Sequence, residues 1–405
     1  MNSPRDSRRL FIGKVATGLA GTMASPSAVL SAGSRIRLGI IGCGDRGLQL
    51  VREALSFPNT EAVGFADVYT RRLEEARRVA PEAKVYPDYR GLLEDKSIDA
   101  VVIATPQHLH GEHFIAALEA GKHIYLEKTM SFTVDDAKRM RAAYRKASHR
   151  VVQIGHQSCS SAMAADAAAF LASGKLGRIT AIEAWHFRNT PHGKAQWARP
   201  VYPDVTPENV LWSQFLGDAG ANRDFDAHRF VNWRLFWDYS GGNVFENMCQ
   251  QLAFWYQALD LQIPQTATMA GGVFLWKDGR EVPDTMHVSL VHGEGLLFNW
   301  SSGFGNNHLG SSEEVLGTDG TLSKSATIRY TPQKVNLPTG RESIGQGVTA
   351  KNAHMLNFFD AIRNGKAPNC PFELGFRVSI ACRMAVESYR QNRTVAWDPV
   401  SEDIV

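Results

Sequence analysis

Short apolar runs alternate with helical patterns from Ile36 to about residue 155. Five runs are rich in Val, Ile and Ala: IRLGIIG, EAVGFAD, IDAVVIA, HIYLE and VVQIG. Between them, segments such as LEEARRVA and EHFIAALEAG carry apolar residues at helical spacing. Strands that alternate with helices pair in parallel and are covered on both faces. The pattern therefore predicts a doubly wound α/β domain over residues 34–155.

The pattern changes after residue 155. A helix over AMAADAAAFLASG and a strand over TAIEAWHF precede a long loop that is rich in Pro and Trp. Runs such as TMHVSLVHG and EGLLFNWSSG read as antiparallel strands, and two long helical patterns close the chain. We predict an α+β domain over residues 156–405, built on a mostly antiparallel open sheet, whose last helix packs back on the first domain. The open face of such a sheet favours a homo-oligomer, a dimer or a tetramer.

The first 33 residues differ in composition from the rest. Arg8 and Arg9 are adjacent and precede a mild segment rich in Gly and Ala, a pattern that resembles a twin-arginine export signal cleaved near Ala28 to Gly33. The expectation is an exported, periplasmic protein, and a basic tail is the alternative. No run reaches the roughly 20 apolar residues that a membrane span needs.

Charge and cysteine content argue against several other classes. The net charge is +3, and no basic stripe interleaved with aromatic residues suggests a nucleic-acid partner. The five cysteines include no Cys-x-x-Cys pair, so neither a disulfide framework nor a zinc site is expected.

A glycine-rich turn follows the first predicted strand. Residues 42–47 read GCGDRG, the G-x-G-x-x-G pattern of a dinucleotide-binding turn that opens a helix. Gly42 permits the tight turn, Gly44 lets the backbone approach a pyrophosphate, and Gly47 allows close helix packing. The N–H groups at the helix start would hold the phosphates. We expect Asp45 and Arg46 to belong to the same cofactor site.

An acid stands at the end of the second predicted strand. Asp67 lies 20 residues after Gly47, where an acid hydrogen-bonds the ribose diol. It favours NAD, because it would repel the 2′-phosphate of NADP. Arg71 and Arg72 nearby leave NADP possible.

The loop after the run IDAVVIA should line the same crevice, since ligands bind at the carboxyl ends of parallel strands. It contains Thr105, Pro106, His108 and His110, which we expect near the nicotinamide end. These histidines and His113 could instead suggest a metal cluster. No acidic ligand accompanies them, and no metal is predicted.

The predicted strand that begins with HIYLE ends on Glu127 and Lys128 in HIYLEKTM. A lone Glu–Lys pair would be a solvated surface pair. Beside a dinucleotide crevice, Lys128 is instead predicted to be the base that takes the proton of an alcohol giving hydride to NAD. Partial burial and the charged nicotinamide are expected to lower the pKa of Lys128. Both residues are predicted to contact the cofactor, and Lys128 to contact the substrate as well.

Taken together, GIIGCGDRG, Asp67, ATPQHLH, GKHIYLEK and the closing NFFDAIRNGKAPNCPFELG resemble the glucose–fructose oxidoreductase, inositol dehydrogenase and rhizopine catabolism family of sugar oxidoreductases. The resemblance covers nearly the whole chain after the N-terminal segment. It implies an N-terminal Rossmann domain and a catalytic lysine at Lys128. The tryptophan-rich WRLFWDYSGGN resembles a subgroup with sugar-related substrates that is often exported with its cofactor tightly held.

The chain departs from the family pattern in two motifs. Thr129 replaces the proline of Glu-Lys-Pro, and in a second motif Glu246 replaces the usual Asp and Gln250 the usual His. On a helix Glu246 and Gln250 would point together, but Gln250 cannot exchange a proton near neutral pH. Three interpretations stay open: Lys128 acts alone, Glu246 or another residue such as His186 takes over, or ordinary redox activity is lost.

A cluster of aromatic and polar residues precedes this motif at Trp233, Arg234, Trp237, Asp238 and Tyr239. Closely spaced tryptophans are usually core, yet a Gly-rich exit suggests a pocket wall on which a sugar could stack. The candidate substrate-binding residues are Lys128, His186, Arg234, Trp237, Glu246 and Gln250.

The leading hypothesis is an NAD(P)-dependent oxidoreductase that acts on a secondary hydroxyl of a sugar, glycoside or cyclitol with tightly bound cofactor. An exported protein meets no free nicotinamide pool, so hydride would pass to a second sugar, or return to the first in a redox-neutral glycosidase or lyase. The alternative of another class, motivated by Gln250, is a sugar- or nucleotide-binding protein without turnover.

Overall fold

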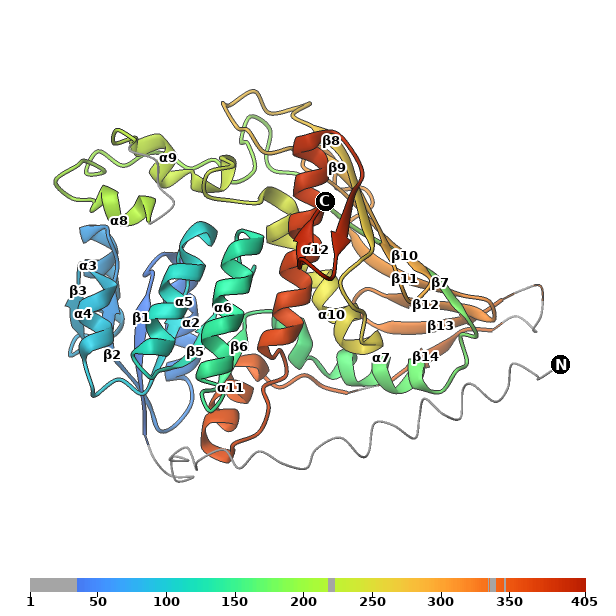
Figure 1. Ribbon diagram of the computed structural model, residues 1–405, viewed down its shortest axis with the longest axis horizontal. Helices are drawn as coiled ribbons and strands as arrows, with labels where there is room; N and C mark the ends of the chain where they lie inside the picture. Colours follow the sequence, from blue (N-terminus) through green and yellow to red (C-terminus); the bar gives the residue numbers. More distant parts are fainter. Residues whose placement is uncertain (1–34, 218–222, 334, 336–339, 346) are drawn as a thin grey trace.

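The computed structural model describes residues 35–217, 223–333, 335, 340–345 and 347–405. The predicted export signal lies outside these residues. The described chain forms two sheets, with helices between and around them (Figure 1). No helix within it is both long and apolar enough to cross a membrane.

The N-terminal sheet is parallel, with strand order β3-β2-β1-β4-β5-β6. Its central strands are buried along almost every residue because helices cover both faces. The short edge strand β3 carries no long apolar run, and the sequence pattern did not predict it. The strands are β1 (Ile36–Ile41), β2 (Thr60–Ala66), β3 (Lys84–Tyr86), β4 (Ala100–Ile103), β5 (His123–Leu126) and β6 (Val152–Ile154).

Helices from both ends of the chain cover this sheet. The later helix α11 (Ala353–Asn364) packs Phe358 and Phe359 into the same apolar cluster as β1 and α2. A capping box of Thr133 and Asp136 begins α6. The other helices are α2 (Asp45–Leu55), α3 (Thr70–Val79), α4 (Tyr89–Glu94), α5 (His110–Glu119) and α6 (Val134–Lys146).

The C-terminal sheet has the order β14-β13-β12-β11-β7-β10-β9-β8-β15-β16. Its neighbours pair antiparallel except β7 and β10, which run parallel. The strands are β7 (Ile179–Phe187), β8 (Thr266–Gly272), β9 (Thr285–His292), β10 (Leu296–Gly303), β11 (Ser311–Gly317), β12 (Gly320–Lys324), β13 (Ile328–Pro332), β14 (Glu342–Ile344), β15 (Val395–Asp398) and β16 (Asp403–Ile404). The predicted fold class, a Rossmann domain followed by a mostly antiparallel α+β domain, is confirmed.

Three helices cover the inner face of this second sheet: α7 (Ala162–Ala172), α10 (Cys249–Leu259) and α12 (Phe372–Gln391). The last of them lies between the two sheets (Figure 1). Ser379 of α12 is hydrogen-bonded to Ser131 across 2.9 Å. A Cβ added at Gly375 would lie 2.5 Å from Ile154 of β6, so the helix approaches the parallel sheet closely there. The two domains therefore share one continuous core.

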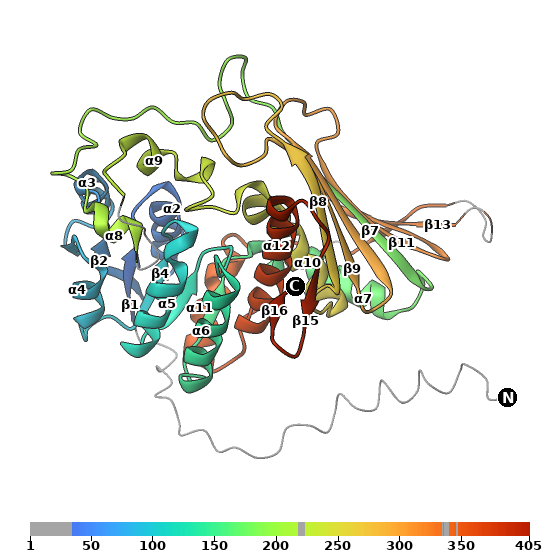
Figure 2. The same cartoon turned by 45° about the horizontal axis from the view of Figure 1, so that its top comes forward.

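A long connection leaves the end of β7 and crosses above the carboxyl edge of the parallel sheet (Figure 2). We call residues 189–217 and 223–235 of this connection the strap. It contains α8 (Trp212–Leu216), α9 (Ala227–Val231) and a 3₁₀ turn (Trp233–Leu235). Backbone hydrogen bonds hold it down, from Leu211 N to Val68 O (2.9 Å) and from Thr70 N to Asn209 O (3.1 Å). The strap forms a roof over the cofactor crevice that the sequence predicted.

Candidate active site

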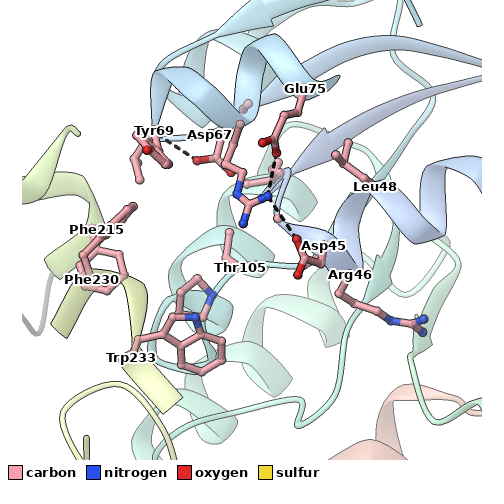
Figure 3. A pocket seen from close by; sticks show the side chains of 18 of the residues that line it. Asp45, Arg46, Leu48, Asp67, Tyr69, Glu75, Thr105, Phe215, Phe230 and Trp233 are labelled. Atoms are coloured by element: carbon pink, nitrogen blue, oxygen red, sulfur yellow. Dashed lines mark hydrogen bonds and ion pairs between the residues drawn. The ribbon is translucent and has the colours of Figure 1, made fainter. Parts of the chain in front are cut away.

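A cavity of about 1330 Å³ lies between the carboxyl edge of the parallel sheet and the strap (Figure 3). Its floor comes from loops that follow β1, β2 and β4, and its roof from aromatic side chains of the strap. The lining residues include Gly42, Gly44, Asp67, Thr105, Phe215, Phe230, Trp233 and Arg234.

The glycine turn is shaped for close approach of a ligand. Gly42 has φ +91°, which favours glycine. A Cβ at Gly47 would lie 1.9 Å from the carbonyl oxygen of Gly42, so only glycine lets α2 start here. A Cβ at Gly44 would meet no atom within 4 Å. The open space beside Gly44, at the start of α2, fits the pyrophosphate of a dinucleotide.

Asp67 directly follows β2 and lines the cavity. Its two carboxylate oxygens accept hydrogen bonds from the backbone N–H of Cys43 (2.7 Å) and of Tyr69 (2.9 Å). Burial raises the pKa of Asp67 to about 6, although these two bonds favour its charged form. Its position is the one from which an acid binds the adenosine ribose.

Asp45 and Arg46 lie at the start of α2 but form ion pairs with different residues. Asp45 pairs with Arg72 (3.1 Å) and with Arg199 of the strap (2.7 Å). Arg46 Nη2 lies 2.7 Å from Glu127 Oε1, and its side chain points away from Asp67 in Figure 3. Arg46 lines the cavity, and the buried Glu127 holds it there through this ion pair.

The loop after β4 divides into two parts. Thr105 and Pro106 line the cavity, as the sequence predicted, and Thr105 Oγ1 lies 3.1 Å from His113 Nδ1. His108 and His110 do not line it: His108 donates to Phe215 O (2.7 Å), and the ring nitrogens of His110 lie against two backbone carbonyls. Burial lowers the pKa of His108 to about 4. Within the described part of the chain, no cluster of three or more His, Cys, Asp or Glu side chains could hold a metal ion.

Lys128 and Glu246 form the polar centre of the site. Lys128 lies just past the end of β5, and Glu246 projects from a π-helix (Val244–Met248) that precedes α10. Lys128 Nζ donates to Glu246 Oε2 (2.6 Å) and to the Glu246 carbonyl oxygen (3.1 Å). Both side chains are largely buried, with 15% and 10% of their surface exposed.

Each member of this pair stabilises the charged form of the other. Burial alone would raise the pKa of Glu246, but Lys128 and Arg234 outweigh it and hold the pKa at about 2. Burial lowers the pKa of Lys128, yet the charge and hydrogen bond of Glu246, together with the charges of Cys249 and Glu127, outweigh burial, and the net pKa is raised. The expected lowering of the Lys128 pKa is therefore wrong for the protein without bound cofactor, because the Glu246 carboxylate lies within hydrogen-bonding distance of the ammonium group.

Two more side chains complete the shell of Glu246. Arg234 Nε donates to Glu246 Oε1 (3.2 Å), and its guanidinium lies 4.2 Å from the centre of the Trp233 ring. Gln107 donates to the same oxygen (3.0 Å) and accepts from the N–H of Gly241. Arg234 also lines the cavity and connects it to the Lys128–Glu246 pair, whose own side chains are not among the lining residues. The sequence analysis missed Gln107, although it belongs to the ATPQHLH motif.

Gln250 has a different partner from Glu246. The Gln250 side chain oxygen lies 3.3 Å from Nδ1 of His156, a fully buried residue that follows β6. The other ring nitrogen of His156 has no partner among the described residues, and burial lowers the pKa of His156 to about 3. Sequence analysis missed His156, which its place after the sixth strand could have suggested.

The two remaining candidates, His186 and Trp237, lie in different parts of the second domain. His186 lies at the end of β7, and its Nε2 accepts from Arg188 (2.6 Å). Burial and then the charge of Arg188 lower the pKa of His186 to about 4, so its imidazole is neutral near pH 7. Trp237 does not join the site: it lies half-buried, 6.0 Å from the Tyr389 ring, at the edge of the core.

Residues 36–156 match the oxidoreductase family with an NAD-binding Rossmann fold, GFO_IDH_MocA. Inositol 2-dehydrogenase of Salmonella typhimurium is 27% identical over 175 residues, which are 43% of this chain and 52% of that protein. A glycosyl hydrolase family 109 protein of Stenotrophomonas maltophilia is 32% identical over 140 residues, 32% of this chain and 31% of that protein. The chain thus spans about half the length of the inositol dehydrogenase, or less in the second case.

Among solved structures, levoglucosan dehydrogenase in complex with NADH and levoglucosan superposes with a TM-score of 0.69 at 20% identity. The match covers 90% of this chain and 99% of that one, so the likeness in fold extends over both domains. The glycine turn, Asp67 and the cavity are the parts of this chain that fit a dinucleotide. Residues 36–156 therefore form a Rossmann domain similar to the NAD-binding domain of the GFO_IDH_MocA oxidoreductase family, followed here by a mostly antiparallel sheet domain.

Proposed function

We propose that this protein is an NAD-dependent oxidoreductase that oxidises a secondary hydroxyl of a sugar, glycoside or cyclitol. The observation that carries the proposal is the buried Lys128–Glu246 pair, which Arg234 links to a cavity whose floor fits a dinucleotide. NAD, when bound, supplies the hydride acceptor. The protein has to orient the hydroxyl and remove its proton.

The pair suits proton removal in a specific way. Lys128 is held as an ammonium by Glu246, and only its neutral form can accept the hydroxyl proton. Glu246 also keeps Lys128 in place through two hydrogen bonds, one from its side chain and one from its backbone. Neutral His186 is an additional hydrogen-bonding group at the end of β7. Lys128 is therefore proposed as the base, and Glu246 as the residue that positions it.

The surroundings of Asp67 favour NAD over NADP. Arg71 and Arg72 are the cations that could have received a 2′-phosphate. Arg71 is paired with Asp204 of the strap (2.6 Å), and Arg72 with Glu75 (2.7 Å) and Asp45. Both guanidinium groups already have carboxylate partners, and a 2′-phosphate near Asp67 would meet further negative charge.

The strap supports tight retention of the cofactor. It covers the cavity and is bound to the parallel-sheet domain by backbone hydrogen bonds and by the Arg71–Asp204 and Arg199–Asp45 ion pairs. A ligand under this roof leaves only when these contacts open. Retention suits an exported enzyme, and we propose export by the twin-arginine route on the basis of residues 1–33.

The outer face of the second sheet supports a homo-oligomer as a further proposal. Val291 of β9 and Leu297 of β10 are cross-strand neighbours, with 39% and 38% of their surface exposed. Light scattering on the purified protein would test it, with a dimer or tetramer expected and a monomer counting against it.

Nucleotide release followed by substrate screening tests the proposed function. Protein purified without added nucleotide is heat-denatured, and the supernatant is analysed for NAD(H) and NADP(H). We expect close to one equivalent of NAD(H). The protein is then offered polyols, and NADH absorbance is followed, with Lys128→Met as the inactive comparison. Bound NAD without turnover of any polyol would instead favour the non-catalytic binding protein.

A redox-neutral glycosidase is a second candidate, supported by the similarity to the glycosyl hydrolase family 109 protein. In that reaction the hydride removed from a hydroxyl-bearing carbon returns to the substrate after the glycosidic group has left. Aryl glycosides separate the two candidates. Release of the aryl group with no net NADH would favour the glycosidase, and NADH without release would favour the dehydrogenase.

A further inference from the structure

Arg188 follows β7 directly and makes its hydrogen bonds to neutral groups. Its Nε donates to Nε2 of His186 (2.6 Å), and its Nη2 donates to the side chain oxygen of Asn247. These bonds use two of the five N–H groups of a guanidinium. Among the described residues, no carboxylate forms an ion pair with it.

The position of Arg188 is fixed from two sides. Ile182 and Ala184 of β7 are buried on the inner face of the sheet, and His186, two residues on, shares that face. On the other side, Asn247 donates to Asn243, which in turn donates to Ser302 of β10 (2.7 Å). Arg188 is thus tied both to the sheet and to the π-helix that carries Glu246.

The charges around Glu246 do not balance. Lys128 and Arg234 already pair with this carboxylate. Arg188 is a third cation with which the Glu246 charge interacts favourably. Glu127, whose charge also acts on Lys128, already pairs with Arg46, so the cations here outnumber the carboxylates. Arg188 is half-buried, and a guanidinium stays charged under these conditions. Burying a cation without an acid costs free energy that a ligand anion would offset.

We propose that the substrate of this site is an anionic polyol, whose carboxylate or phosphate binds Arg188 while the hydroxyl to be oxidised lies at Lys128. The planar guanidinium has three N–H groups left, and it binds such oxyanions in a two-pronged geometry. The inference rests on the proposed function, because Lys128 marks the reacting end. It narrows the substrate class to sugar acids or sugar phosphates.

Isothermal titration calorimetry on the NAD-loaded protein tests the inference. The probes are D-glucuronate, D-gluconate and glucose 6-phosphate, each compared with D-glucose and myo-inositol. We expect at least one anion to bind about 10-fold or more tightly than the neutral probes, since a charged hydrogen bond contributes roughly 1.5–3 kcal/mol. Which of the anions binds best separates a carboxylate site from a phosphate site.

Substitutions then assign the preference to Arg188. Arg188→Gln should abolish the preference for the anion and leave binding of neutral probes unchanged, while Arg188→Lys should retain part of it. Arg329→Gln is the matched control, because Arg329 is exposed on the edge-side strand β13 and the change in net charge is the same. If Arg188→Gln keeps the preference, if neutral probes bind as tightly as anions, or if none of the five probes binds, the inference is overturned.

Measuring NADH formation with the same five probes distinguishes a failure of this inference from a failure of the proposed function. If anions bind through Arg188 and no probe is oxidised, anion binding is supported and the dehydrogenase assignment fails. If neutral polyols are oxidised and the wild type neither binds nor oxidises any anion better than them, the assignment is supported and anion recognition is overturned.

Discussion

At the residue scale, Lys128 is the group on which the proposed chemistry depends. Lys128→Met should lower kcat by about 10²- to 10⁴-fold, the usual contribution of a general base. NAD binding should persist, because the glycine turn and Asp67 are untouched. Lys96→Met is the matched control, since Lys96 is exposed on the same domain. A Lys128→Met protein with wild-type kcat would rule out the assigned base.

The Glu246 carboxylate sets the pH at which Lys128 becomes neutral. In the wild type the raised pKa of Lys128 means that activity should increase with pH through the alkaline range. Glu246→Gln removes the largest influence raising that pKa, while burial still lowers it. The rising limb of the kcat/KM profile should therefore move to lower pH in this variant. An unmoved limb would mean that Lys128 is not the titrating group.

Asp67 should make NAD affinity depend on pH near 6. Its pKa, raised to about 6 by burial, belongs to the protein without cofactor. The carboxylate accepts hydrogen bonds from a ribose diol better than the protonated acid, so affinity should increase as pH rises through 6 and decrease below it. Titration calorimetry from pH 5 to 8 measures this, and Asp67→Asn should bind weakly with no such dependence.

At the scale of elements, two glycines of the turn between β1 and α2 allow effects on NAD binding and on folding to be tested separately. Gly44→Ala meets no atom within 4 Å, so thermal stability should be preserved, yet the methyl group would occupy the space of the pyrophosphate. Gly47→Ala would place a Cβ 1.9 Å from Gly42 O, so the protein should be destabilised or fail to fold. Thermal unfolding and NAD titration together check the pair. Tight NAD binding by Gly44→Ala would contradict the placement of the phosphates.

Helices whose apolar residues recur at regular spacing were predictable from the sequence. Two elements, β3 and the π-helix, were not. The long helices α7, α11 and α12 lie within the segments that the helical pattern indicated. The three-residue β3 is too short to show a period. The π-helix at Val244–Met248 was expected to be an ordinary helix, because its wider turn leaves no sequence pattern of its own.

At the scale of the whole molecule, the two domains should unfold together because one core cluster includes residues of both. All nine tryptophans lie after residue 155, so their fluorescence reports on the second domain and on the strap. The proposed cofactor, NAD, would bind the first domain, and at 100 times its Kd it should stabilise the fold by about 2.7 kcal/mol. Fluorescence and circular dichroism midpoints should therefore shift together on adding NAD. A tryptophan signal that ignores NAD would show that the domains unfold independently.

The sequence by itself determined the features that neighbouring residues encode. Strand and helix periods, the glycine turn and the acid 20 residues after it are local patterns, so they predicted the Rossmann domain, the cofactor crevice and the place of Lys128 at a strand end. These depend on backbone geometry over a few residues, which the residue types set directly.

Only the tertiary structure decided what surrounds Lys128. Glu246 lies 118 positions further along the chain, yet its carboxylate is 2.6 Å from the Lys128 ammonium and reverses the expected direction of its pKa. Gln107, Arg188 and His156 likewise gain their roles from contacts with the π-helix or with residues near it. Electrostatic interactions depend on distance and burial, and both arise only when distant segments pack together.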